Sequence, residues 1–184
     1  MPGADPEPPA PAAAPALELL LERDVPPAAD GADAVPDHAF LHGWAAHALG
    51  ATFPDSPPPA RAELSTRLVD EATMRALNRE WRGRDAPTNV LSFPAGLPPL
   101  DDGDGALLVL GDLVLCPAVV AAEARARGVP AADHWAHLVV HGVLHLRGHD
   151  HESDAEAHAM ESLETRLLAA RGLPDPYAEP VPET

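Results

Sequence analysis

Six of the ten histidines lie within residues 133–152, which read DHWAHLVVHGVLHLRGHDHE. His141 and His145 are four residues apart in a segment with helical periodicity. Both imidazoles therefore project from one face, about one turn apart, and can bind one metal ion. Gly148 can turn the chain back at the helix end, which brings His151 to the same ion. The spacing H-x3-H-x5-H thus predicts a metal centre with three nitrogen ligands: His141, His145 and His151.

Three protein ligands with a further position for water are the arrangement of a catalytic zinc ion rather than a structural one. Such an ion lowers the pKa of bound water and supplies a nucleophile at neutral pH. Three imidazoles also suit nickel, copper or iron, so we expect one divalent ion, with zinc as the first candidate. His149 can compete with His151 as third ligand, although the glycine turn favours His151. His137 and His134, one and two turns earlier, fit satisfied polar groups or side chains that orient a ligand.

The same histidine spacing occurs in the metzincin peptidases, which carry a glutamate directly after the first histidine as general base. Gly142 occupies that position in this sequence. A peptidase of that mechanism would lack its base, and Asp112 or Asp150 would have to supply one. This residue moves the prediction away from proteolysis.

Arginines are concentrated in one segment. All twelve basic residues are Arg, and six of them lie within residues 61–84. Within residues 75–84 four arginines are opposed only by Glu80, and guanidinium groups bind phosphate in a bidentate manner. Arg75 and Arg79 fit a solvated helix face. The segment is therefore a candidate phosphate-binding patch in a strongly acidic chain.

Arg82 and Arg84 differ from the other arginines because they follow the helix, in a loop that leads into a strand. Such loops commonly carry functional groups. We expect Asp85 to pair with one of these two arginines or to cap the turn. Trp81 is expected to belong to the core.

Hydrophobic periodicity and capping residues indicate both helices and strands. Strands are expected at residues 17–22, 63–69, 88–93 and 106–116, and helices at 36–50, 70–81, 117–128, 131–146 and 153–172. Pro36 is expected at the first helical position, Asp70 as a cap, and Ser153 with Glu156 as a capping box. This pattern predicts a single α+β domain with a four-stranded mixed sheet and about five helices. The metal site lies at the end of the histidine-rich helix.

The distribution of proline delimits the folded part of the chain. Of the 23 prolines, six lie in residues 1–15 and four in 174–182, so we expect tails at 1–15 and 173–184 around a domain at 16–172.

The formal net charge of −17 argues against a generic DNA-coating or membrane-surface protein. The single cysteine, Cys116, excludes an intramolecular disulfide. The start lacks signal-peptide features and no apolar run reaches membrane-spanning length, so we expect a cytoplasmic protein.

Three segments together resemble one family. HGVLHLRGHDH (141–151), LNREWRGRDAPTNVLSFP (77–94) and GDLVLC (111–116) are similar to the YbeY family of bacterial rRNA maturation endoribonucleases. The resemblance covers about residues 16–172. It implies one α+β domain with a four-stranded mixed sheet, a zinc ion on the histidines named above, and a functional arginine at Arg82 near the metal. The family usually has tyrosine at Trp81 and His149 and lysine at Arg84.

The resemblance also implies the substrate. The family matures the 3′ end of small-subunit rRNA and takes part in ribosome assembly and quality control. We therefore expect metal-assisted cleavage of single-stranded rRNA, with Arg82 on the scissile phosphate and His141 holding the metal as the catalytic residues. The nucleophile is either water or the 2′-hydroxyl, and the general base is not assigned. Two other classes are a metal-dependent hydrolase of another kind and a non-catalytic ribosome assembly factor with a structural metal.

Overall fold

The computed structural model describes residues 14–25, 35–54, 57–101, 103–149 and 153–178. This part of the chain contains five strands and five helices. The strands are β1 (Ala16–Arg23), β2 (Arg61–Leu68), β3 (Val90–Pro94), β4 (Leu100–Asp101) and β5 (Ala106–Leu115). The helices are α1 (His38–Gly50), α2 (Glu71–Arg82), α3 (Pro117–Arg127), α4 (Ala131–Leu146) and α5 (Asp154–Ala169).

The strands form one mixed sheet in the order β1-β2-β5-β3, and β4 also pairs with β5. β1 and β2, and β2 and β5, run parallel, whereas β3 and β4 run antiparallel to β5. The predicted α+β fold with a mixed sheet is confirmed, but the sheet has a fifth strand. β4 is only two residues long, too short for the alternation that identifies a strand in a sequence.

Helix starts follow the capping residues, with one correction. α1 begins at His38 and its N-cap is Asp37, so Pro36 lies before the helix rather than at its first position. Asp70 caps α2 and the capping box at Ser153 is present, as predicted. A cap of this kind contributes about 1 kcal/mol to helix stability. None of the described helices is long and apolar enough to cross a membrane.

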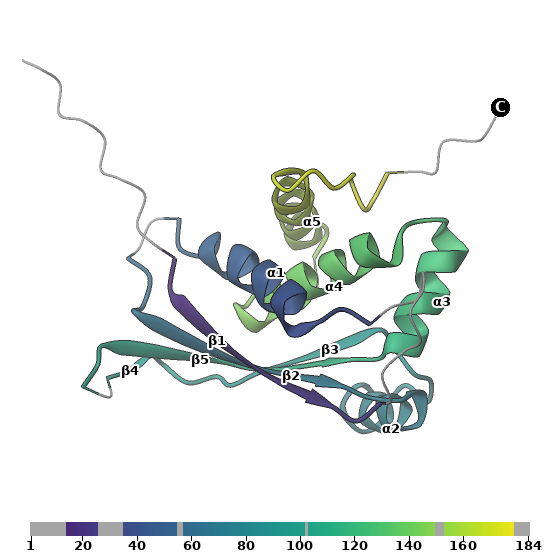
Figure 1. Ribbon diagram of the computed structural model, residues 1–184, viewed down its shortest axis with the longest axis horizontal. Helices are drawn as coiled ribbons and strands as arrows, with labels where there is room; N and C mark the ends of the chain where they lie inside the picture. Colours follow the sequence, from purple (N-terminus) through teal and green to yellow (C-terminus); the bar gives the residue numbers. More distant parts are fainter. Residues whose placement is uncertain (1–13, 26–34, 55–56, 102, 150–152, 179–184) are drawn as a thin grey trace, which may run out of the picture.

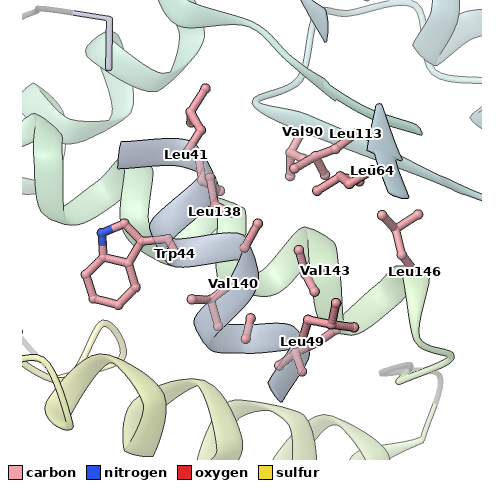
Figure 2. Close-up of a cluster of buried hydrophobic side chains, with 14 of the residues drawn as sticks. Leu41, Trp44, Leu49, Leu64, Val90, Leu113, Leu138, Val140, Val143 and Leu146 are labelled. Atoms are coloured by element: carbon pink, nitrogen blue, oxygen red, sulfur yellow. The ribbon is translucent and has the colours of Figure 1, made fainter. Parts of the chain in front are cut away.

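Helices cover the sheet unequally. α1 and α4 pack over one face, and α2 lies on the other (Figure 1). Figure 2 shows the main core, where Leu41 and Trp44 of α1 and Leu138 of α4 gather with Leu64 and Leu113 of the sheet. A smaller cluster beneath α2 contains buried residues of both layers, namely Val69, Met74, Leu91, Val114 and Cys116. The larger core therefore fixes α4, which carries the histidines.

α4 lies close against the sheet at Gly142. A Cβ atom on this glycine would lie 2.2 Å from Leu113 Cδ1 and 3.3 Å from Ser92 Oγ. The Ser92 hydroxyl donates to the carbonyl oxygen of Gly142 at 3.2 Å. A side chain here would overpack the interface between α4 and the sheet. A glutamate directly after His141 would therefore require Leu113 to move, and this chain has no general base at that position.

Candidate metal centre

Four histidines follow one another along α4: His134, His137, His141 and His145. Their spacing of three, four and four residues places them along one side of the helix. The centroids of successive rings are 6.3, 6.1 and 4.5 Å apart. The last pair is the closest, and it is the pair that the sequence predicts as metal ligands.

The Nε2 atoms of His141 and His145 lie 3.1 Å apart. Two nitrogen ligands of a tetrahedral zinc ion, each about 2.0–2.1 Å from the metal, are about 3.3 Å apart. The two imidazoles therefore converge on one position at the separation that a shared ion requires. Imidazole nitrogens are also donors that zinc prefers.

Glu164 of α5 accepts hydrogen bonds from two of the α4 histidines. Its side chain is 0% exposed. The Nδ1–H of His141 donates to Oε1 at 2.8 Å, and the Nε2–H of His137 donates to Oε2 at 3.2 Å. Because Nδ1 of His141 faces the carboxylate, its Nε2 faces His145. A carboxylate behind a ligating histidine fixes the tautomer and orientation of the ring.

The same carboxylate is ionised at neutral pH. Burial raises the pKa of Glu164, but hydrogen bonds from His137, His141 and Tyr177 outweigh it and lower the pKa to about 2. Glu164 is not among the site residues that the sequence predicts. The signal was present, because Glu164 is an acidic residue on the apolar stripe of Met160 and Leu167, and such a residue is rarely buried without partners.

A second ligand set is also possible in the described part of the chain. Ligand atoms of His137, His141 and Glu164 all lie within 4.8 Å of one another, so these three side chains could hold a metal ion. Nδ1 of His137 is buried and has no hydrogen-bond partner among the described residues. From the sequence, His137 is expected to be a satisfied polar group or a side chain that orients a ligand. Its Nε2 bonds to Glu164, which agrees with that expectation, and its place in the cluster also makes it a possible ligand. Both ligand sets share His141.

The turn after α4 has the predicted glycine. Gly148 has φ +83°, and its N–H donates to the carbonyl oxygen of His145 while the N–H of His149 donates to that of Leu144. This pattern of two bonds closes a helix end and reverses the chain. His151 lies in residues 150–152, outside the described part, so its role as third ligand stays a prediction. His149 is half-buried next to the turn.

The described C-terminal residues, 173–178, pack beside the histidines. Arg127 of α3 donates to the carbonyl oxygen of Pro176, and the Tyr177 hydroxyl donates to Glu164. The Tyr177 ring lies 5.5 Å from that of His137. Burial and the bond to Glu164 raise the pKa of Tyr177, so its hydroxyl remains a donor. The domain boundary at residue 172 stays a prediction.

The predicted arginine lies apart from this cluster. Arg82 is the exposed last residue of α2, and α2 lies on the opposite face of the sheet from α4 (Figure 1). Asp85 pairs with Arg75, with Nη2 2.7 Å from Oδ2, rather than with a loop arginine. No ion pair of Arg82 or Arg84 is found among the residues that the structure describes. Arg82 and Arg84 are both exposed.

Trp81 corrects another expectation. It is 64% exposed and does not belong to the core. Its ring lies edge-on to that of Phe93, with centroids 5.6 Å apart. α2 buries only Met74 and Asn78, and the residues of its last turn are exposed.

A cleft of about 500 Å³ opens beside the histidines. Its walls come from α3, α4, the start of β3 and the C-terminal segment. It is lined by Asn89, Val90, Glu123, Ala126, Arg127, His134, His137, Leu138, His141 and Tyr177. The cleft brings His141 within reach of a ligand, and Arg82 is not among its lining residues.

Comparison with known proteins gives one consistent result. Residues 31–172 match the family model described as Endoribonuclease YbeY. The chain is 52% identical over 165 residues to a protein of that name from Alkalilimnicola ehrlichii, covering 89% of this chain and 93% of the relative. The corresponding protein of Stutzerimonas stutzeri is 50% identical over 167 residues, covering 90% and 96%. A third, from Halorhodospira halophila, is 61% identical over 117 residues, covering 64% and 75%.

Proposed function

Because the chain belongs to the YbeY endoribonuclease family, we propose that it cleaves single-stranded ribosomal RNA with one metal ion held by His141, His145 and His151. By this membership it is an endoribonuclease, a hydrolase of RNA phosphodiester bonds. The observation that carries the metal assignment is the 3.1 Å separation of the His141 and His145 Nε2 atoms. Glu164 favours this set over the one containing His137, because three donors already occupy its carboxylate.

We assign zinc as the metal, because its geometry fits two imidazoles at this spacing. A bound zinc ion supplies Lewis-acid activation of a water molecule or of a phosphoryl oxygen. Two side chains of the protein orient the ligand His141. Glu164 accepts the Nδ1–H of His141 and thereby keeps Nε2 directed at the metal. The Tyr177 hydroxyl donates to the same carboxylate and holds it in place.

The proposed substrate is the 3′ end of small-subunit rRNA, on ribosomal particles in the cytoplasm. The net charge of −17 disfavours loose binding to arbitrary nucleic acid, so the particle supplies part of the recognition. Sedimentation of a cell lysate checks this part of the proposal. The protein should migrate with small-subunit particles, and migration only as free protein contradicts it.

The test of the function is metal removal. The native protein should cleave a single-stranded RNA that spans the 3′ end of small-subunit rRNA and leave DNA of the same sequence intact. Stripping the metal with a chelator should abolish cleavage, and added Zn²⁺ should restore it. Metal content per chain is measured alongside the cleavage rate.

Other outcomes assign the chain differently. Cleavage by protein whose metal has been shown to be removed rejects the metal mechanism. Hydrolysis of peptides but not of RNA supports a hydrolase of another class. A tightly bound metal, a thermal midpoint that falls without it, and no cleavage of RNA or of small-subunit particles support an assembly factor with a structural metal.

From the sequence, Arg82 is expected on the scissile phosphate, but α2 lies on the opposite face of the sheet from α4 (Figure 1). We propose that Arg82 binds another phosphate of the same RNA backbone. It is exposed at the end of α2, and Arg75 rather than Arg82 neutralises Asp85. Because hydrogen bonds to charged groups contribute about 1.5–3 kcal/mol, Arg82→Ala should lower kcat/KM about 10- to 100-fold. Arg79→Ala, which removes the same charge from an exposed position of the same helix, should change kcat/KM less than about threefold. Equal losses in the two variants would show that only the general charge of α2 matters.

A further inference from the structure

A second polar cluster lies in the same cleft and is not used by the metal chemistry. Oε2 of Glu123 is 2.8 Å from Nε2 of His134 and 2.9 Å from Nδ2 of Asn89. Asn89 Oδ1 in turn accepts the N–H of Val90 at 2.6 Å, which fixes the orientation of the amide. The three side chains of this cluster come from α3, α4 and the residue before β3. All three line the cleft that also contains His141.

The cluster presents its carboxylate to the cleft. The Glu123 side chain is 37% exposed, whereas that of His134 is only 3% exposed. His134 thus acts as a buried support, and Glu123 is the member that a ligand can reach. Burial raises the pKa of Glu123, but hydrogen bonds from His134 and Asn89 outweigh it and leave the pKa lowered. An ionised carboxylate is an acceptor only, so its ligand must offer an N–H or O–H group rather than a phosphate.

Position along α4 relates the cluster to the reaction centre. His134 and His141 are seven residues apart in one helix, which is about 10.5 Å along the helix axis. That distance is larger than one phosphate group. A ligand that reaches both positions must therefore include a neighbouring nucleotide as well as the cleaved phosphate. Val90, Ala126 and Leu138 add apolar surface to the same cleft. A sugar or base can lie against such a surface, whereas a phosphate is poorly suited to it.

We propose that Glu123, held by His134 and Asn89, binds a hydrogen-bond donor of a nucleotide that flanks the cleaved phosphodiester bond. The donor is a ribose 2′-hydroxyl or an N–H group of a base. Glu123 is then a specificity residue of the cleft. This proposal rests on the proposed function, because it requires RNA to occupy the cleft beside His141.

The test compares substrates that lack one donor at a time. Short RNAs carry a single 2′-deoxy or 2′-fluoro nucleotide at successive positions around the cleaved bond. A second series removes the amino group of one base, with inosine for guanosine or purine riboside for adenosine. In the wild type, one modification should lower kcat/KM about tenfold or more, because it leaves the carboxylate without its donor. A sensitive sugar position identifies the ribose as the source, and a sensitive base position identifies the base.

Glu123→Gln should lose activity on the unmodified RNA and show less than about a twofold further loss on the sensitive RNA. This ratio compares two substrates on the same protein, so a lower folded fraction does not change it. Glu18→Gln, an exposed change on the opposite edge strand β1, should keep the sensitivity of the wild type. Wild-type sensitivity that persists in Glu123→Gln, or a wild type insensitive to every modification, overturns the proposal.

Binding separates this inference from the function on which it rests. Fluorescence anisotropy of the same labelled RNAs is measured with metal-loaded protein. If no RNA is cleaved but one modification weakens binding to the wild type and not to Glu123→Gln, the nucleotide site stands and the nuclease proposal fails. If RNA is neither cleaved nor bound, both fail.

Discussion

Replacement of His145 by alanine is expected to lower the rate of RNA cleavage by a factor of roughly 10³ or more, because a metal ion contributes several kcal/mol of transition-state stabilisation. His145 Nε2 lies 3.1 Å from His141 Nε2, so the change removes one of two converging ligands. His145 is half-buried at the helix end, and its removal leaves the bond from His141 to Glu164 in place. The fold should therefore be kept while metal binding is lost.

Three measurements on one preparation check this result. Circular dichroism and a thermal midpoint report the fold, elemental analysis reports metal per chain, and an RNA of the small-subunit 3′ end reports cleavage. His158→Ala, the same substitution at an exposed position of α5, should keep both metal and activity. A folded His145→Ala protein with wild-type metal content and rate would move the site to His137, His141 and Glu164.

Most helices and strands of the fold can be predicted from local hydrophobic periodicity. The bounds of α4 are those that the sequence predicts. The signals that set them are local: apolar residues at helical spacing, Pro130 directly before the helix and Gly148 after it. The alternation in β2 likewise appears directly as alternating burial. β4 escapes the prediction because two residues cannot show a period. The residue type of Trp81 predicts a core position, but Trp81 is 64% exposed at the end of α2, which only the packing of α2 on the sheet reveals.

The metal centre is predictable only in the part that lies within one helix. His141 and His145 are neighbours by helical spacing alone, so the sequence predicts their proximity. Glu164 reaches His141 across 23 residues, and Tyr177 reaches His137 across 40, through the packing of α5 and the C-terminal segment. No local pattern encodes these contacts. The sequence therefore predicts the pair of candidate ligands but not the side chains that orient them.

Glu164→Gln is expected to lower the free energy of unfolding of the metal-free protein by about 3 kcal/mol at pH 7. The folded-state pKa of about 2 lies below the ordinary value of 4.5, and each pKa unit corresponds to about 1.36 kcal/mol. The amide also places an N–H group against the donors of His137, His141 or Tyr177. The same change should weaken metal binding about 10- to 100-fold, as loss of an orienting carboxylate does.

The sign of the pH dependence follows from the lowered pKa. The unfolded chain takes up the proton more readily than the folded one, so the stabilisation is complete above about pH 4.5 and is lost as the pH falls towards 2. The difference between wild type and Glu164→Gln should therefore shrink to less than half its neutral value at about pH 3. Urea unfolding of both proteins, with Glu161→Gln as an exposed control on α5, measures this difference. A difference that stays constant from pH 7 to pH 3 would mean that the buried carboxylate is already protonated at neutral pH.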